Sequence, residues 1–586
     1  MSRTLFLYIF KPLLKVFLGA SGVIAAIMSF GGLLRPLTEN GLNMSQVGEM
    51  LAYAMPAMTT YSYPIAALFA CTVVYGRLAA DNEVTAVRAA GISLGPMGLG
   101  LPAVVLGVLV SILSLGMLSF IVPAATLQVE RAVVSNIGQF VVNRIERQHQ
   151  VRLYQTGSQP LTIFARSARV EPPEADSPNE QVVVLDNVSI ITYARGDADS
   201  KLQVPDEFYV ARQAKAYIRQ PGADEADDKP VLLRASLVDG MKFPRSVVNR
   251  AEAAIQGGVR TQQFGPFPMR SPLRENTKFM DIRRLKELHA APDKSRRMQE
   301  LLETFIRTDQ QLTFLTSLKS QLIDGSGMAQ FKTTGTDAYT LLPAGQVPTL
   351  DGTRLLIGST STNGASVGAP VVAPSAVPGS GVQLIQRRKD APSITTVARE
   401  ASVRVFPDSA AKRLAVAIEL LDAVVRVDGL ESARDSFERS FSIDMPPALL
   451  KLTQLTASDY MARPDITAQQ KLSLRRNLMK QDNSVVSEMH SRASFAVSCL
   501  VLTVVGYALG VMFKSGNYLN AFAVTVIPAI ISVVLIVTGQ HICENVPGDM
   551  PDNFKNPLQM GLIVIWSGNA LVLGLAIVLL AKLRRT

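Results

Sequence analysis

Cysteine, tryptophan and charge are all scarce in this 586-residue chain. Three cysteines, Cys71, Cys499 and Cys543, are too few for a disulfide framework, and the first two lie in apolar runs. Charged residues make up 18% of the chain and hydrophobic residues 48%, so part of it is expected in lipid. A net charge of +10 with one tryptophan and no basic-aromatic interleaving disfavours nucleic acid and favours a membrane surface or an anionic lipid.

Motifs that would mark an enzyme are also missing. No Gly-Lys dipeptide occurs, so the chain has no phosphate-binding loop and is not itself a P-loop ATPase. The four histidines show no paired metal-ligand spacing. Residues 91–95 match G-x-S-x-G, but a nucleophile elbow needs a strand before the serine, and a helix is expected there. We therefore predict no enzymatic activity and no catalytic, cofactor or metal site.

Stretches without Asp, Glu, Lys or Arg that are long enough to span a bilayer occur six times. They are residues 16–34, 50–76, a run centred on 101–122, 493–513, 515–539 and 556–581. We interpret the first as a retained helix rather than a signal peptide, because a second span follows directly. None of the six contains the ionisable residue that ion-driven carriers usually bury, so any energy source is expected in another subunit.

Basic residues gather on one side of these predicted spans. They are Arg3, Lys11, Lys15, Arg77, Arg88, Lys514, Lys582, Arg584 and Arg585. The positive-inside rule therefore places both termini in the cytoplasm and the long loop between the third and fourth spans outside.

That long loop is expected to be rich in β-strands. Near-alternating apolar residues predict strands over 160–245 and 395–427, while helical spacing of leucines predicts a helix over 281–323. Residues 325–382 are rich in Gly, Ser, Thr, Pro and Ala and are interpreted as a loop. Three segments share Ala-Arg-x-Ala, at 165–168, 211–214 and 398–401, which is either a weak β repeat or a coincidence.

These patterns divide the chain into six parts. Residues 1–125 hold spans one to three with a short helix at 77–93, and residues 493–586 hold spans four to six. The parts between them are a first β part at 126–284, a helical and low-complexity insertion at 285–385, a second β part at 386–445 and a helical connector at 446–492. The sequence leaves open whether the two β parts form one domain or two modules.

The short helix at 77–93, with the sequence RLAADNEVTAVRAAGIS, joins spans two and three. Asp81 is the expected N-cap, Glu83 complements the positive end of the helix dipole, and Arg88 falls in the last turn. Gly91 can take the left-handed position after the helix. The alternative is an interfacial helix lying on lipid, but acidic residues would then face anionic headgroups. A protein partner is the better interpretation.

The same stretch is similar to the R-L-x-x-D-x-E-[LV]-T-A-[LV]-R-A-A-G-[IV]-S motif of the lipopolysaccharide-export permeases, the LptF/LptG (YjgP/YjgQ) family. Other positions that resemble the family are Pro56, Pro64, Pro123 at the end of span three, Glu488, His490 and Arg492 before span four, and Trp566 and Asn569 in the last span. The resemblance implies three spans, a periplasmic β-jellyroll and three further spans in the inner membrane. The external region is longer than the family's single jellyroll, and 285–385 has no counterpart there.

The resemblance also implies a function. It predicts a permease subunit that extracts lipopolysaccharide from the outer leaflet of the inner membrane and passes it to a periplasmic β-jellyroll bridge. Its partners would be a cytoplasmic ABC ATPase dimer, which would bind the Mg-ATP, and a second permease that is paralogous or identical. The ATPase-coupling residues would be Arg77, Asp81, Glu83, Arg88 and Gly91.

Substrate contacts are predicted less directly. Arg35, at the outer end of span one, could bind a lipid phosphate bidentately or could simply anchor the helix at the interface. Tyr61 and Tyr63 belong to a polar patch at 59–63, for which helix packing around two prolines is the alternative. The apolar inner faces of the strands would hold acyl chains or form a core. Two further functions stay open: a mechanotransmitting permease and a membrane-anchored envelope scaffold, neither of which moves lipid.

Overall fold

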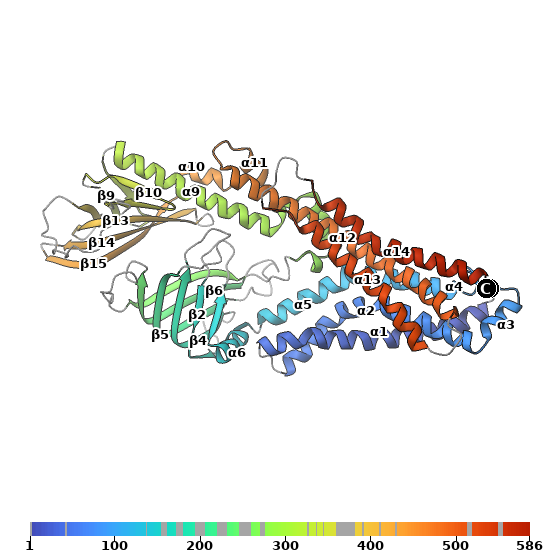
Figure 1. The fold of residues 1–586 in the computed structure, drawn as a ribbon. Helices are drawn as coiled ribbons and strands as arrows, with labels where there is room; N and C mark the ends of the chain where they lie inside the picture. The colour runs from blue at the N-terminus through green and yellow to red at the C-terminus, as the bar shows by residue number, and fades with distance from the viewer. Residues whose placement is uncertain are drawn as a thin grey trace, which may run out of the picture. The chain divides into compact units, whose positions relative to one another are not determined.

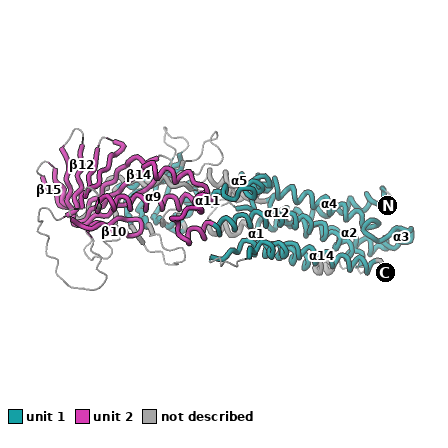
Figure 2. Tube along the Cα trace, turned by 90° about the horizontal axis from the view of Figure 1, so that it is seen from above, with its two compact units in different colours: residues 1–298, 475–586 teal, residues 299–474 magenta. Residues whose placement is uncertain are grey.

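The computed structural model describes most of the chain. The described residues are 3–40, 44–135, 137–153, 161–171, 180–193, 205–219, 231–244, 259–269, 276–324, 327–335, 337–343, 345–358, 381–388, 392–408, 412–427, 430–512, 518–548 and 555–585. They form two compact units, one made of Met1–Met298 with Arg475–Thr586 and the other of Gln299–Leu474 (Figure 2).

Six helices of the first unit are long and apolar enough to cross a bilayer, which confirms the predicted count (Figure 1). They are α1 (Arg3–Asn40), α2 (Met44–Ala80), α4 (Leu101–Gly116) with its continuation, α12 (Ala468–Met512), α13 (Tyr518–Glu544) and α14 (Leu558–Arg585). Helix α12 has 45 residues, roughly 68 Å at 1.5 Å per residue. The second half of the predicted connector at 446–492 is therefore part of α12 and not a separate helix.

Span three does not end at Pro123, so that prediction was wrong. Helix α4 continues through a π-helical turn, η1 (Met117–Ile121), into α5 (Val122–Ser135), and α6 (Ile137–Gln148) follows. Proline lacks the amide hydrogen that would bond the carbonyl of residue 119, and its ring crowds that carbonyl. A π turn placed directly before the proline accommodates this defect without breaking the helix. Residues 126–135 and 137–148, which were predicted as part of a β region, are helical.

The fourth span packs very closely against the second. A Cβ atom at Gly506 would lie 2.7 Å from the Leu68 carbonyl oxygen, and one at Gly510 would lie 3.0 Å from that of Thr72. Small residues at such positions let two helix backbones approach each other, which is a main source of helix association in lipid. The core of the bundle is therefore built around α2 and α12.

The first unit also contains a seven-stranded antiparallel sheet. Its strands are β1 (Gln150–Leu153), β2 (Leu161–Phe164), β3 (Ser167–Glu171), β4 (Glu180–Tyr193), β5 (Pro205–Arg219), β6 (Val231–Pro244) and β7 (Val259–Met269). Helix α6 covers this sheet, because Val142 and Ile145 join the same apolar cluster as the buried residues of β4 and β5. Three short helices come next in sequence: η2 (Thr277–Phe279), α8 (Ile282–Ala290) and η3 (Pro292–Lys294).

The second unit is built on an eight-stranded antiparallel sheet. Its strands are β8 (Ala329–Lys332), β9 (Ala338–Leu342), β10 (Pro348–Asp351), β11 (Arg354–Ile357), β12 (Val382–Arg387), β13 (Ile394–Asp408), β14 (Arg413–Val427) and β15 (Leu430–Asp444). A bridge between Thr333 and Ile443 joins the end of β8 to β15, so the sheet curls back on itself. Helices α9 (Arg296–Asp324), α10 (Pro447–Leu452) and α11 (Ala457–Ala462) complete the unit.

Helix α9 packs on the apolar face of the second sheet. Leu315, Leu318 and Leu322 share one buried cluster with residues of β8, β9 and β11 to β15. The Gln311 amide donates to the Val405 carbonyl at 2.8 Å, which ties the helix to β13. This face therefore forms a core, the simpler of the two alternatives that the sequence left open.

The predicted insertion at 285–385 is corrected by these strands. Its helical part agrees with α8 and α9, but β8 to β11 and the start of β12 lie in the stretch predicted as a loop. The β part predicted to begin at residue 386 thus begins near residue 329. Residues 359–380 of the predicted loop lie outside the described residues. The two β parts are two separate sheets, not one enlarged domain.

The Ala-Arg-x-Ala segments occupy matching places in the two sheets. The pairs are 211–214 with 185–188 of β4 and 398–401 with 420–423 of β14, whereas the third segment pairs only at 167–168, with 185–186 from the other edge of β4. In both partner strands the third residue has a positive φ: Asn187 and Asp422 each have 51°. A shared register with a shared left-handed residue favours a β repeat over coincidence.

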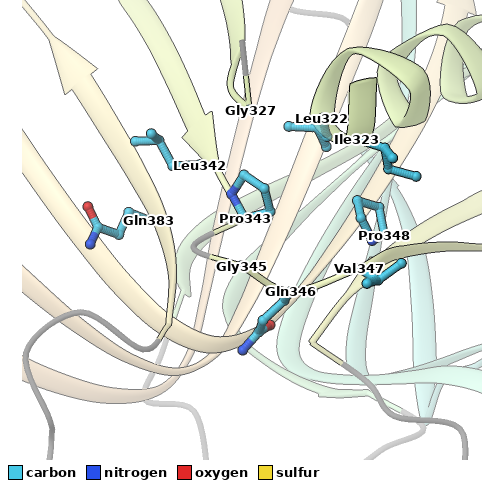
Figure 3. A pocket seen from close by; sticks show the side chains of 10 residues that line it. All are labelled: Leu322, Ile323, Gly327, Leu342, Pro343, Gly345, Gln346, Val347, Pro348 and Gln383. Atoms are coloured by element: carbon cyan, nitrogen blue, oxygen red, sulfur yellow. The ribbon is translucent and has the colours of Figure 1, made fainter. Parts of the chain in front are cut away.

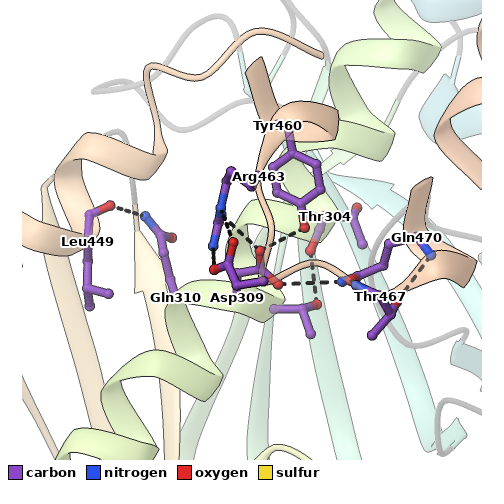
Figure 4. Close-up of polar contacts among 10 residues, drawn as sticks. Thr304, Asp309, Gln310, Leu449, Tyr460, Arg463, Thr467 and Gln470 are labelled. Carbon is purple, nitrogen blue, oxygen red and sulfur yellow. Dashed lines mark hydrogen bonds and ion pairs between the residues drawn. The ribbon is translucent and has the colours of Figure 1, made fainter. Parts of the chain in front are cut away.

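A buried polar cluster fastens α9 to the helices that follow the second sheet (Figure 4). Asp309 accepts hydrogen bonds from the Tyr460 hydroxyl at 2.7 Å and from Arg463 at 3.2 Å. Nearby, the Gln310 amide donates to the Leu449 carbonyl at 2.9 Å. Burial, together with the hydrogen bond to Asp309, raises the pKa of Tyr460 well above its usual value.

This shift predicts how the stability of the second unit depends on alkaline pH. Above pH 10.0, the ordinary pKa of tyrosine, the unfolded chain loses the Tyr460 proton while the folded chain keeps it. The free energy of unfolding must therefore fall as the pH rises. We expect Tyr460→Phe to make this fall shallower in chemical denaturation of the full chain between pH 8 and about pH 11. Tyr339→Phe is the comparison, because burial also raises the pKa of Tyr339. If both variants make the fall in unfolding free energy equally shallow, the alkaline dependence is not specific to Tyr460.

Candidate functional site

The segment that joins spans two and three forms a short helix after a sharp turn. Helix α2 extends to Ala80, and the new helix, α3 (Glu83–Ala89), begins only at Glu83. The predicted N-cap was wrong: Asp81 pairs with Arg77 at 3.5 Å, and Asn82 precedes the helix in a left-handed conformation with φ 58°. Asparagine tolerates this conformation better than most residues, which allows the chain to reverse there.

The other end of α3 closes as the sequence predicts. Gly91 has a φ of 79°, and Arg88 lies in the last turn. The Gly91 amide donates to the Arg88 carbonyl at 2.9 Å, and the Ile92 amide donates to the Val87 carbonyl at 3.2 Å. These two bonds define a Schellman motif, in which glycine pays no steric penalty for a positive φ. The turn is a capped, defined helix rather than an irregular loop.

One side of α3 rests on the beginning of span one. Val84 is buried, and with Leu78 it belongs to the apolar cluster that includes Ile9 and Leu13 of α1. The Tyr8 hydroxyl donates to Glu83 Oε1 at 3.0 Å. Sequence reasoning missed Tyr8, because nothing in the local pattern links residue 8 to residue 83. The first turn of α3 is therefore held by span one through both an apolar contact and a hydrogen bond.

The chain after α3 is anchored by two tyrosines. The Tyr75 hydroxyl donates to the Leu99 carbonyl at 3.0 Å, and the Tyr507 hydroxyl donates to the Leu94 carbonyl at 2.6 Å. The two rings meet edge to face with centroids 4.7 Å apart. The G-x-S-x-G match at 91–95 thus lies in a turn held by tyrosines, after a helix and not after a strand.

The opposite side of α3 is exposed. Thr85, Ala86, Arg88 and Ala89 are all accessible to solvent. A rigid helix that presents small side chains beside a charged one suits close approach by another protein. The carboxylate of Glu83, next to this face, is partly exposed.

The predicted substrate residues differ in their surroundings. Tyr63 is buried against Phe17, with ring centroids 5.7 Å apart, whereas Tyr61 is 42% exposed and lies edge-on to Phe495. Hydroxyls of the 59–63 patch donate to helix carbonyls, among them Thr60 to Pro56 at 2.8 Å, as expected for packing around Pro56 and Pro64 within α2. Arg35 lies in α1, but its side chain falls outside the described part, so lipid contact remains a prediction.

Several positions that resemble the permease family meet between α12 and α14. The Trp566 indole donates to His490 Nδ1 at 3.2 Å. The Asn569 amide donates to the Ser494 carbonyl at 2.7 Å and to its hydroxyl at 2.8 Å. Glu488 and Arg492 form a buried ion pair one turn apart on α12, at 2.8 Å. The structure thus brings together residues that lie about 75 positions apart in the sequence.

No metal centre or enclosed catalytic cleft emerges from the part of the chain that the structure describes. No three His, Cys, Asp or Glu side chains gather there as a metal ion would require. The second unit has an open cavity of about 530 Å³ where α9 ends, lined by Leu322, Leu342, Val347 and their neighbours (Figure 3). Its lining contains no group that could act as an acid, a base or a nucleophile.

Two groups of three spans separated by a β-rich region, with a seated helix between spans two and three, define a multi-pass membrane protein. The sequence model for "Lipopolysaccharide export system permease LptF/LptG" matches residues 7–139 and 377–582, more than half of the chain. The chain therefore belongs to the LptF/LptG family of lipopolysaccharide export permeases, which are transporter components rather than enzymes. A comparison with individual curated proteins gives no match.

The match leaves a long internal stretch of the chain uncovered. The unmatched stretch from 140 to 376 contains the whole first sheet, α8, α9 and β8 to β11. It is more than twice as long as the 285–385 insertion predicted from the sequence. The spans, strands β12 to β15 and helices α10 and α11 are the parts that the family model covers.

Proposed function

We propose that this chain is the permease subunit of an ATP-driven glycolipid exporter. It extracts lipopolysaccharide from the outer leaflet of the inner membrane and passes it to a periplasmic β-jellyroll bridge. The seating of α3 on span one carries this proposal. Glu83 accepts a hydrogen bond from Tyr8 while its helix exposes the opposite face, so a partner that pulls on α3 pulls on a transmembrane helix.

The partner of α3 is a cytoplasmic ABC ATPase dimer. The chain has no phosphate-binding loop, and Mg-ATP is bound by the partner, which leaves this chain without a cofactor of its own. The positive-inside rule places α3 and both termini in the cytoplasm and the β sheets in the periplasm. A second permease, paralogous or identical, completes the transmembrane path.

The experiment reconstitutes the chain with its candidate ATPase and second permease in proteoliposomes that contain lipopolysaccharide. ATP-dependent transfer of the lipid to an added periplasmic bridge protein supports lipid export. ATP hydrolysis that moves the bridge protein without transferring lipid would favour a mechanotransmitter. Absence of any ATPase complex would favour a membrane-anchored scaffold.

Tyr8→Phe tests how span one supports α3. The change removes the hydroxyl that bonds Glu83 at 3.0 Å but keeps the ring. The bond lies at an exposed site, where water competes for both groups, so we expect a modest weakening of the ATPase complex, less than about tenfold, or a matching loss of lipid-stimulated hydrolysis. Combining Tyr8→Phe with Glu83→Gln should give less than the sum of the two effects. Fully additive effects would show that Tyr8 does not act through Glu83.

A further inference from the structure

The segment that leads to the second unit is docked on the helix of span four. Leu285 and Leu288 of α8 are fully buried against Val485 of α12, and Met280 and Met489 border the same cluster. At the edge of this contact, His289 meets Asp482 at 2.9 Å. Residues 280–289 therefore have a specific, apolar attachment to α12.

Arg492 reinforces this attachment from inside the span bundle. Its guanidinium Nη2 donates to the carbonyl oxygens of Thr277 and Lys278, each at 3.2 Å, and of Met280 at 2.8 Å. These carbonyls come from η2 and the residue after it, where a short helix has unsatisfied acceptors. The side chain is only 3% exposed, so the bonds are formed in a largely dry site.

The same network reaches span five. Glu488 accepts from Arg492 Nε at 2.8 Å with one oxygen and from the Gln540 amide of α13 at 2.8 Å with the other. A second link runs in parallel, because the Ser484 hydroxyl lies 3.0 Å from the Thr277 hydroxyl and donates to Glu544 at 3.0 Å. Spans four and five thus hold the segment together.

The family model matches one side of this contact and not the other. Arg492, Glu488 and Gln540 lie within the range that the family model matches, whereas residues 276–290 lie in the stretch that it does not match. The docked segment continues directly into α9, whose first residue is Arg296. A segment outside the family match is therefore fastened to the matched transmembrane part through a buried charge.

We propose that Arg492 and Glu488 are positioning residues that clamp residues 276–281 to spans four and five and keep that joint closed throughout the transport cycle. We name Arg492, Glu488, Gln540, Thr277 and Ser484 the Arg492 clamp. A buried ion pair contributes little net stability compared with apolar packing, but it fixes one arrangement of hydrogen bonds. The clamp thereby makes residues 276–290 move with the transmembrane helices. This proposal rests on the proposed lipid export.

The test breaks the clamp and then replaces it covalently. Arg492→Gln should lower lipid transfer per ATP hydrolysed by at least about tenfold, because several charge-assisted hydrogen bonds are lost. The ATPase complex and its basal hydrolysis should be unchanged, since α3 is not involved. Thr277→Cys with Ser484→Cys should form a disulfide, because the two hydroxyls are 3.0 Å apart. Added to Arg492→Gln, this disulfide should restore transfer to within about twofold, and reduction should abolish the rescue.

Each result decides the proposal. Normal transfer by Arg492→Gln overturns it, and so does a cross-link that forms without rescuing that variant. If Arg492→Gln does not fold, the cysteine pair is tested in the otherwise unchanged chain. Loss of lipid transfer on oxidation would show that the joint must open during the cycle, and would overturn the proposal. The two single-cysteine variants control for pairing with the buried native cysteines. Glu83→Ala distinguishes a failure of the proposed lipid export from a failure of the clamp. Among the variants of this experiment, only Glu83→Ala should disrupt the ATPase complex.

Discussion

Glu83→Ala is expected to uncouple the permease from the proposed cytoplasmic ATPase almost completely. The change removes both the acceptor of the Tyr8 hydroxyl and the only carboxylate of α3. We propose that the ATPase buries this carboxylate in a hydrogen-bonded charge pair, and truncating one partner of such a buried pair costs about 2–5 kcal/mol, which corresponds to a loss of affinity between about thirtyfold and several thousandfold. The measurement is co-purification with the ATPase and lipid-stimulated ATP hydrolysis in proteoliposomes.

Glu83→Gln is the matched variant for this experiment. Glutamine can still accept the Tyr8 hydroxyl but carries no charge, so we expect it to lose most of the ATPase affinity while keeping α3 seated. Glu303→Ala serves as the control, because Glu303 pairs with Arg307 at an exposed site on α9, outside α3, and such pairs contribute little. An unchanged ATPase complex in Glu83→Ala would refute α3 as the coupling helix.

Leu315→Ala is expected to have the largest effect on stability. Leu315 is fully buried between α9 and the second sheet, and truncating such a leucine costs about 2–5 kcal/mol, because the cavity cannot close completely. In the full chain this should accelerate hydrogen exchange in β13 and β14 and lower the unfolding midpoint of the second unit by about 5–15 °C.

Thr316→Ala is the control for this prediction. Thr316 neighbours Leu315 on α9 but is exposed, so its replacement should change stability by less than about 0.5 kcal/mol. Similar hydrogen-exchange profiles for the two variants would mean that α9 does not stabilise the sheet, and that its apolar face is available to another ligand such as an acyl chain.

The spans were predictable because their signal is local. Twenty or so residues without charge identify a span whatever it packs against, and the structure has six helices at the expected places. Gly91 was predictable for a similar reason, since a glycine after a periodic helix has few other uses. The Asp81 N-cap was wrong because α2 continues past Arg77, and the ion pair between these two residues competes with capping.

The second β unit was harder to predict because its decisive contacts are distant. Strands β8 to β11 are only four or five residues long and carry glycines and prolines between them, so their composition is typical of a loop. They become strands by pairing with β12, β13 and each other. The links from Tyr8 to Glu83 and from Arg492 to residues 277–280 are equally invisible in sequence, because they join positions 75 and more than 200 residues apart.

The π turn at Met117–Ile121 changes which side chains of span three share a face. Each residue of a regular helix advances by about 100°, and a π turn accommodates one extra residue in its loop. Side chains before Gly116 and after Val122 are therefore out of phase by roughly one residue. A cysteine-accessibility scan along this helix should show a periodic signal whose phase shifts by about one residue at the π turn. The lipid-facing positions of the two halves should therefore not fit one continuous helical repeat.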